Sequence, residues 1–377
     1  MGVSRAVFAV CMGCSALVGS GNVLKNGINS SMSQLQFQSS AIATTAGVTG
    51  AFVTCCALEL VGVGRSTGTP PWRKVLHDLR PWMLLGGVLG AASVGFQTFL
   101  IDPIGAVLLH VVQLSTELVV AIIVDSFGCL ALPKRKVTPM RVLGVTTSIL
   151  GACSTVNDFE QHSAAAAASD EAAGPRATGL ALVLYLALAV LIGCVRPVQT
   201  VVNGGMRRAL CSPVRAATVS IAVSLAVLAT LSAAQIFSSD VLRISVSSAF
   251  SAQTKLLWWH ALSGPMSTYS VVAPVLFAPI VSLSGFSGAS MTGQLATSLL
   301  ADHFGAFGMH VVPLTLQRVG GVFVVLCGAF IVRWADATSA KRAAAVAAAA
   351  APSGGAAGAA DSEKQSLIDG KSELDEE

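Results

Sequence analysis

Long apolar runs separated by short polar stretches dominate the chain. A helix of about 20 mostly apolar residues crosses a membrane, because each residue rises about 1.5 Å through a hydrocarbon core of roughly 30 Å. By this criterion the sequence predicts ten membrane-spanning helices and an all-α integral membrane fold. The expected spans are 5–24, 38–62, 82–101, 104–124, 140–156, 179–201, 214–237, 258–277, 278–299 and 316–334.

The composition agrees with a membrane location. Only 11% of the residues are charged and 53% are hydrophobic, whereas about 25% of the residues in soluble domains are charged. The chain also lacks a phosphate-binding loop, a zinc-spaced Cys/His cluster and a Gly-x-Ser-x-Gly nucleophile motif. We therefore expect no enzymatic activity, no cofactor, no metal site and no nucleic-acid partner, with membrane lipid surrounding the protein.

The basic residues are distributed unevenly between the expected loops. With the N-terminus in the cytosol, 17 of the 23 lysines and arginines fall on the cytosolic side, and five, including Lys25, fall on the other side. The remaining one, Arg196, lies within a span. Because basic residues are retained on the cytosolic side during insertion, this asymmetry predicts that both termini are cytosolic.

Polar segments divide the chain into four regions. Residues 157–178 are rich in Ala, Ser and acidic residues, which predicts a linker loop between two halves, 1–156 and 179–334. Residues 335–377 are rich in Ala and Gly and then acidic, which predicts a flexible cytosolic tail.

The tail carries one short motif. Glu363, Leu367 and Ile368 have the spacing of an acidic dileucine sorting signal, which vesicle adaptors read as an exposed aliphatic pair. If the motif works in this way, the protein belongs to a eukaryotic plasma membrane or to an endolysosomal or vacuolar membrane. A pattern of this length also arises by chance.

The chain matches itself when it is shifted by 177 residues. Asp125-Ser126-Phe127-Gly128 falls on Asp302-His303-Phe304-Gly305, and 11 of the 37 positions from 118 to 154 are identical. Each copy holds five expected spans, and an odd number places the second copy upside down. Inverted repeats of this kind are a recurrent architecture of secondary transporters, in which exchange between two similar arrangements gives alternating access.

The second repeat also carries a family pattern. Its last 45 residues contain Gly293-Gln294-Leu295, Asp302-His303-Phe304-Gly305, Pro313-Leu314, Arg318 and Gly328. This pattern resembles the small bacterial YdcZ-type family of the drug/metabolite transporter (DMT) superfamily, whose members are single five-helix units. The resemblance implies an EamA-like, dimer-like transporter fold over about 5–334. A single unit needs a partner in that family and the fusion supplies one, so a monomer or a homodimer is expected.

Two ionisable residues within the expected spans are candidates for function. Glu117 and Arg196 each cost about 2.5–3.5 kcal/mol to insert on biological scales, so such residues usually have a role. Their helices both run inward, and an ion pair between them is geometrically allowed. Glu117 is expected to bind substrate or to couple transport to protons. Arg196 either lines the path or extends to the lipid headgroups.

A polar stripe accompanies each of two repeat-related helices. His110 and Gln113 share one helix face with Glu117. The equivalent positions of the second repeat are Ser287, Ser290 and Gln294. Two such faces predict a central hydrophilic cavity. The alternative is hydrogen bonding between helices, which is the favoured interpretation for the serines and for Gln97 and Gln199.

The repeated Asp-x-Phe-Gly motif follows an apolar helix in each half. Asp125 can pair with Arg141, and Asp302 can pair with Arg318. Such pairs act either as clips that fix the loop or as gates that open during transport.

These observations predict a secondary transporter that moves a small metabolite or drug-like solute by alternating access. Two alternatives remain from the sequence. A channel or lipid scramblase would show flux without saturation or exchange. A non-transporting scaffold or trafficking protein would depend on its tail.

Overall fold

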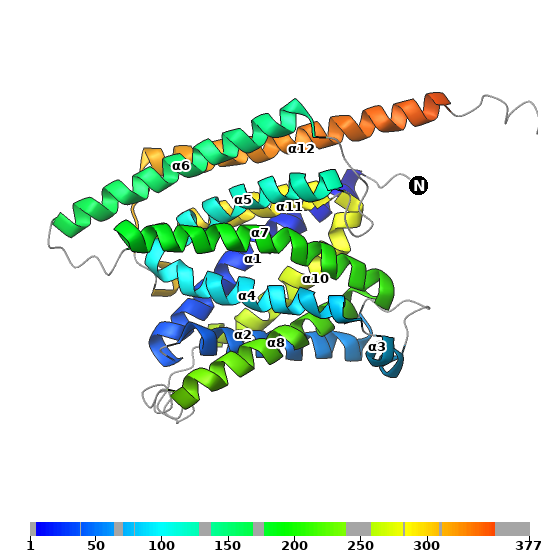
Figure 1. Cartoon of the computed structure of the whole chain (residues 1–377), viewed down its shortest axis with the longest axis horizontal. Helices are drawn as coiled ribbons and strands as arrows, with labels where there is room; N and C mark the ends of the chain where they lie inside the picture. The colour runs from blue at the N-terminus through cyan, green and yellow to red at the C-terminus, as the bar shows by residue number, and fades with distance from the viewer. Residues whose placement is uncertain are drawn as a thin grey trace, which may run out of the picture. The chain divides into compact units, whose positions relative to one another are not determined.

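The computed structural model describes residues 5–37, 39–63, 71–78, 80–127, 137–168, 177–238, 258–281, 283–308 and 311–350. The chain divides into two compact units, Met1–Arg333 and Trp334–Glu377. The described residues form helices and no strand (Figure 1). The elements are α1 (Arg5–Met32), η1 (Ser33–Phe37), α2 (Ser40–Val61), α3 (Trp72–Asp78), α4 (Pro81–Ile104), α5 (Ala106–Phe127), α6 (Pro139–Ala168), α7 (Gly179–Leu210), α8 (Pro213–Ser238), η3 (Trp258–Leu262), α10 (Ser263–Val281), α11 (Leu283–Phe304), η4 (Ala306–Gly308) and α12 (Leu316–Ala350).

The helices fit an integral membrane protein. Seven helices of the described residues are long and apolar enough to cross a membrane. Helices suit this solvent because they satisfy their own backbone hydrogen bonds. The other three expected spans, 140–156, 258–277 and 278–299, lie in α6, in η3 with α10, and across the end of α10 and α11, and remain predictions. Large apolar side chains such as Leu60, Phe127 and Leu316 are exposed on the outer surface, where lipid would cover them.

Several helices, among them α1, α6 and α12, extend beyond the expected limits. Helix α1 continues to Met32, so Lys25 lies in a helix and is buried, not in a loop. Helix α6 continues to Ala168, so the first part of the expected linker is helical. Helix α12 likewise continues to Ala350, into the segment expected as a flexible tail. Alanine is the strongest helix former, and it prolongs α6 and α12 beyond the apolar stretch. The sorting motif, Glu363, Leu367 and Ile368, lies outside the described residues.

The helix limits repeat with the offset of the sequence. Helices α5 and α11 begin at 106 and 283 and end at 127 and 304, a shift of 177 residues at both ends. Helix α1 packs against α10 and α11, and its equivalent α7 packs against α4 and α5. Figure 1 shows α7 lying between α4 and α5. The first helix of each repeat therefore packs on the third and fourth long helices of the other repeat.

Helices α6 and α12 meet through glycines. A methyl group at Gly144 would lie 2.7 Å from the carbonyl oxygen of Gly328, and one at Gly151 would lie 2.6 Å from that of Gly321. From the first contact to the second, the residue number increases along α6 and decreases along α12, so the two helices are antiparallel. Small residues permit this close backbone approach, as in other packed membrane helices.

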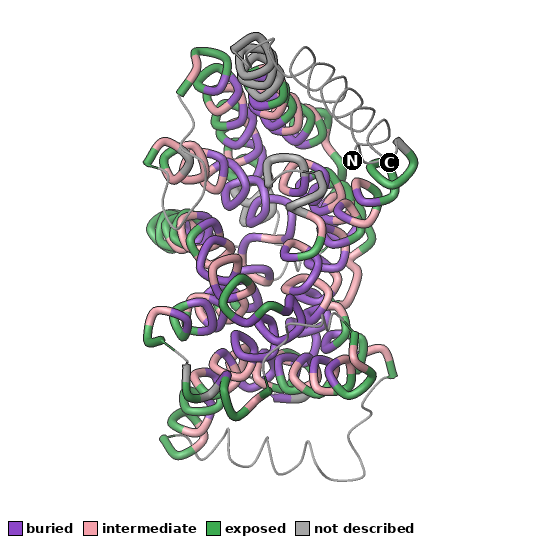
Figure 2. The backbone as a smooth tube through the Cα atoms, turned by 90° about the vertical axis from the view of Figure 1, so that its right-hand side faces the viewer, coloured by how far each residue is buried: buried purple, intermediate pink, exposed green. Residues whose placement is uncertain are grey.

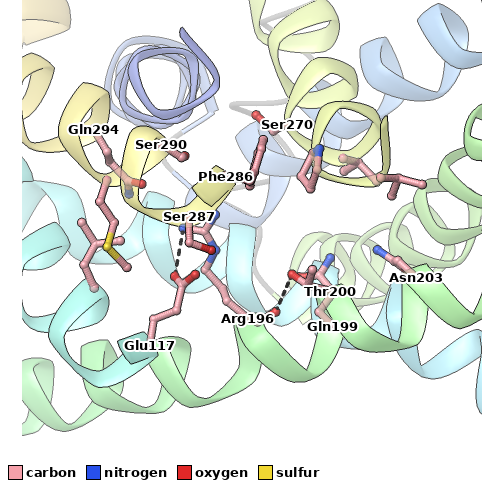
Figure 3. A pocket seen from close by; sticks show the side chains of 15 residues that line it. Glu117, Arg196, Gln199, Thr200, Asn203, Ser270, Phe286, Ser287, Ser290 and Gln294 are labelled. Atoms are coloured by element: carbon pink, nitrogen blue, oxygen red, sulfur yellow. Dashed lines mark hydrogen bonds and ion pairs between the residues drawn. The ribbon is translucent and has the colours of Figure 1, made fainter. Parts of the chain in front are cut away.

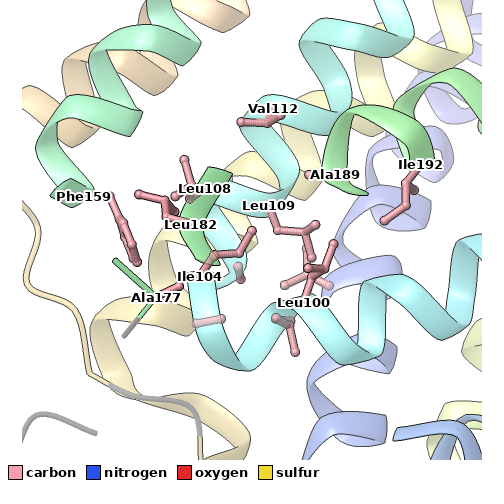
Figure 4. Packing of buried hydrophobic residues seen from close by; sticks show 14 residues of the cluster. Leu100, Ile104, Leu108, Leu109, Val112, Phe159, Ala177, Leu182, Ala189 and Ile192 are labelled. Carbon is pink, nitrogen blue, oxygen red and sulfur yellow. The ribbon is translucent and has the colours of Figure 1, made fainter. Parts of the chain in front are cut away.

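An apolar cluster connects α5 and α7 to their neighbours. Leu108, Leu109 and Val112 of α5 pack with Leu182 and other side chains of α7 (Figure 4). Further members come from α4 and α6, as Leu100, Ile104 and Phe159. Buried residues, purple in Figure 2, lie mostly where the helices pack against one another. This packing fixes α5 against α7, the two helices that carry Glu117 and Arg196.

Candidate functional site

A polar cavity of about 80 Å³ lies between α5, α7, α10 and α11 (Figure 3). Its polar part combines one acidic and one basic side chain with several hydroxyl and amide groups. The lining residues are Leu114, Glu117, Arg196, Gln199, Thr200, Asn203, Ser270, Val271, Pro274, Val275, Phe286, Ser287, Ser290, Met291 and Gln294.

Glu117 and Arg196 form an ion pair in this cavity. Arg196 Nη1 lies 3.9 Å from Glu117 Oε2, and neither atom has a hydrogen-bond partner among the described residues. Figure 3 shows the two side chains pointing toward each other below Ser287. The ion pair that the sequence allows is therefore present in the structure, while the role of the two residues in transport stays a prediction. The pair is loose, and each partner keeps bonding capacity for a third group.

The local sequence of α7 brings Arg196 to α5. A methyl group at Gly193 would lie 2.6 Å from the carbonyl oxygen of Gln113, so only glycine allows this approach of the two helices. Pro197 lies inside α7 and lacks the backbone N–H that would bond the carbonyl of Gly193. The contact and the missing hydrogen bond both lie within one turn of Arg196.

The predicted polar face of α11 lies opposite the ion pair. Ser287, Ser290 and Gln294 all line the cavity. Gln294 is buried, and its Nε2 has no hydrogen-bond partner among the described residues. Behind this face α1 packs closely on α11, because Gly19 lies against the backbone of Ser290.

The predicted polar face of α5 is only partly in the cavity. His110 and Gln113 are fully buried and do not line it. His110 Nδ1 lies 2.7 Å from the carbonyl oxygen of Ala106 and 3.0 Å from Ser298 Oγ. Neither the oxygen nor the nitrogen of the Gln113 amide has a partner among the described residues. The structure therefore does not place His110 and Gln113 in the cavity, and their role in a transport path stays a prediction.

Some polar residues of the site were either not singled out from the sequence or, as with Gln199, assigned to hydrogen bonding between helices. Gln199, Thr200 and Asn203 follow Arg196 along one face of α7 and line the cavity, as does Ser270 of α10. The three residues of α7 lie three, four and seven positions after Arg196, a spacing that places them on its helix face and could have identified them from the sequence.

A second missed group lies on α1. Asn22, Lys25 and Asn26 are buried there, and Asn26 Nδ2 donates to Gln97 Oε1 at 2.7 Å. This last contact is the helix–helix hydrogen bond expected of Gln97. The expected span ended at residue 24, so the polar residues that continue the helix were assigned to a loop.

The second Asp-x-Phe-Gly motif forms a buried clip. Arg318 Nη2 lies 3.8 Å from Asp302 Oδ2, as expected. The backbone N–H groups of Ala106 and Val107 also donate to the Asp302 carboxylate, both at 2.9 Å. Asp302 thus caps the N-terminus of α5, where a negative charge is favourable. Gly105, with φ of +76°, makes the turn into this helix.

The first copy of this motif is only partly described. Arg141 is buried, whereas the side chain of Asp125 lies outside the described residues. Whether either clip opens as a gate stays a prediction.

A larger, mostly apolar cavity of about 690 Å³ lies between α2, α3, α4 and α8. At its polar end Arg215 Nε lies 3.3 Å from Glu59 Oε2, and the guanidinium lies 5.2 Å from the centre of the Trp72 ring. Exposed Leu60 and Leu84 also line it. Such a groove suits contact with lipid and lacks the run of polar groups that marks the cavity between α5 and α11.

Comparison with known proteins identifies the family. The family described as "Putative inner membrane exporter, YdcZ" matches residues 10–154 and again residues 184–331. No curated protein matches the chain. The two matches cover most of the sequence and end 177 residues apart, the offset of the internal repeat. The chain therefore belongs to the YdcZ family of DMT-type membrane proteins, as a tandem of two family units.

Proposed function

We propose that this protein is a secondary transporter that moves a small solute across a membrane by alternating access. Its family consists of exporter-type membrane proteins, which favours transport over catalysis. The polar cavity within the helices supplies a place for a solute. The mechanism is inferred from how the two repeats are related.

The ten long helices are proposed to span the membrane as two inverted five-helix repeats. Support comes from α6 and α12, which occupy equivalent places in the two repeats. They run antiparallel, with Gly144 against Gly328 and Gly151 against Gly321. Two equivalent helices that cross one membrane in opposite directions belong to units of opposite orientation.

One observation carries the proposal: five polar residues that line the cavity have polar counterparts 177 positions earlier that are buried and do not line it. Gln199 and Asn203 line the cavity, whereas Asn22 and Asn26 are buried. The other pairs, with the lining residue first, are Ser270 with Ser93, Ser287 with His110, and Ser290 with Gln113.

This difference is what alternating access requires. One half of a polar path is open, while the equivalent half is packed shut against the neighbouring helices. Several of the buried members, such as Gln113 and Asn22, keep polar atoms without partners among the described residues. Unpaired buried polar groups are costly, so a state that hydrates this half compensates for part of its lost packing.

Glu117 and Gln294 are also equivalent positions, and both lie where the two half-paths meet. In the proposed cycle the solute binds at the loose Glu117–Arg196 pair, and the rearrangement then opens the other half. Protonation of Glu117 would release Arg196 and couple the cycle to protons. With both termini in the cytosol, the open half faces the cytosol, because α5 and α7 then run inward.

The test is transport by the purified protein in liposomes. Ligands from a metabolite library are first identified by their effect on the melting temperature, since a ligand of the folded state stabilises it by mass action. Each hit is then tested for saturable uptake and counterflow. Glu117→Gln should abolish counterflow, whereas Glu160→Gln, on an exposed position of α6, should not.

Other outcomes identify the alternatives. Flux that neither saturates nor exchanges indicates a channel or scramblase. Absence of any ligand or flux, with cellular function lost on removal of residues 351–377, indicates a scaffold.

A further inference from the structure

Lys25 is a buried basic residue within an apolar helix. It lies on α1 within the candidate span Ala6–Leu35, and 6% of its surface is exposed. It forms no ion pair or hydrogen bond with any described residue. A charge held in this way within a membrane helix is expensive and usually marks a functional site.

The charges around Lys25 do not balance. The charge that acts on Lys25 is that of Arg196, and both of these cations act on His110. The carboxylate in this group is Glu117, which pairs with Arg196. Glu117 therefore balances the charge of Arg196, and Lys25 has no acidic partner among the described residues. An uncompensated buried charge is strongly destabilising. Lys25 can avoid this cost by losing its proton, or it can keep its charge when a further negative charge is bound nearby.

The groups that face the ion pair can also hold an anion. Arg196 Nη1 and Gln294 Nε2 belong to residues that line the cavity, and neither atom has a hydrogen-bond partner among the described residues. Both are N–H donors. A guanidinium binds a carboxylate with two parallel hydrogen bonds, which gives geometric selectivity as well as attraction.

The size of the cavity limits the solute. About 80 Å³ accommodates on the order of five to eight water molecules, at roughly 10–15 Å³ for each. Cavities for drug-sized ligands are about 300–1,000 Å³. A small solute with one carboxylate therefore fits both the volume and the charge count.

We propose that the solute is a small organic monocarboxylate whose carboxylate binds at Arg196, with its charge balanced by Lys25. This inference rests on the proposed transport function and specifies its substrate class. Lys25 and Arg196 come from α1 and α7, the equivalent first helices of the two repeats. A bound anion would thus interact with both halves of the path, which gives the solute a way to influence their exchange.

The experiment measures binding to the full-length protein in detergent at constant ionic strength. The probes are a series of small monocarboxylates, of which acetate is the smallest, and matched neutral amides and alkylammonium ions. The monocarboxylates should raise the melting temperature of the wild type, and the amides and ammonium ions should not. Lys25→Met should raise the Kd between tenfold and a hundredfold, the effect of losing one charged interaction of about 1.5–3 kcal/mol.

Three variants keep the test decisive. Lys74→Gln, on an exposed position of α3, should bind as the wild type does. Lys25→Arg retains the charge and should bind within severalfold of the wild type. If Lys25→Met does not fold, Arg196→Gln removes the other cation and should show the same loss of binding.

Two results would overturn the inference. In the first, monocarboxylates bind Lys25→Met, or Arg196→Gln if that variant is the one that folds, as tightly as they bind the wild type. In the second, neutral or cationic solutes bind and carboxylates do not. Counterflow separates the two proposals: saturable, Glu117-dependent exchange of a neutral or cationic solute retains the transport function and removes the anion assignment. Absence of exchange for every solute removes both.

Discussion

Gly193→Ala tests whether the close contact between α5 and α7 positions the ion pair. The added methyl carbon would lie 2.6 Å from the carbonyl oxygen of Gln113 and 2.7 Å from Cβ of Thr116. A carbon–oxygen contact needs about 3.3 Å, so the helices must separate locally by roughly 0.7 Å. Overpacking of this kind costs about 1–3 kcal/mol. The separation would also lengthen the Glu117–Arg196 distance, already 3.9 Å, beyond the range of a direct ion pair.

The matched control is Gly204→Ala on the same helix, where a methyl group meets nothing within 4 Å. Replacing glycine by alanine in a helix gains up to about 1 kcal/mol, so this control should be as stable as the wild type or slightly more stable. Thermal unfolding in detergent should place Gly193→Ala about 2–6 °C below Gly204→Ala. Equal melting temperatures, together with unchanged ligand binding, would refute the tight α5–α7 contact and its role in holding Arg196.

The remaining predictions concern other fixed points of the fold. Asp302→Asn should lower the free energy of unfolding by about 3–5 kcal/mol, because it removes the charge that pairs with the buried Arg318 and weakens the cap of α5. The melting temperature checks this, and the double variant Asp302→Asn/Arg318→Gln should recover part of the loss. A single variant that melts with the wild type would show that the clip is dispensable. Gly151→Ala should destabilise α6 against α12 by about 1–3 kcal/mol, since its methyl group would lie 2.6 Å from the carbonyl oxygen of Gly321, whereas Gly320→Ala, with nothing within 4 Å, should not. Equal unfolding of these two variants would contradict the glycine-mediated crossing.

The sequence indicates two of the ion pairs in the structure, Glu117 with Arg196 and Asp302 with Arg318, for a physical reason. Ionisable groups are costly within a membrane, so two of opposite charge on neighbouring helices usually pair, as Glu117 and Arg196 do. The pairing of Asp302 with Arg318 followed from the repeated motif. What the motif did not reveal was the cap on α5, because that contact joins segments about 195 residues apart through backbone N–H groups.

Other features depend on information that hydropathy does not carry. Lys25 was assigned to a loop because a charge usually ends an apolar run, yet the helix continues to Met32 with its polar side chains buried. His110 and Gln113 share a helix face with Glu117, but periodicity cannot tell which residues of that face line the cavity. The helical residues from 157 to 168 were assigned to a linker because they are polar, although alanine-rich sequence needs no lipid to remain helical.

Paired cysteine labelling tests the central claim, alternating access between two equivalent half-paths, most directly. Ser287→Cys and His110→Cys place a thiol at equivalent positions of the open and the closed half, in a background without the nine native cysteines. Membrane-impermeant reagents are applied from either side of oriented vesicles, with and without a ligand. We predict that the thiol of Ser287→Cys is labelled from one side and the thiol of His110→Cys from the opposite side, and that a ligand raises one rate as it lowers the other. Labelling of both thiols from the same side, or no labelling of His110→Cys under any condition, would contradict alternating access.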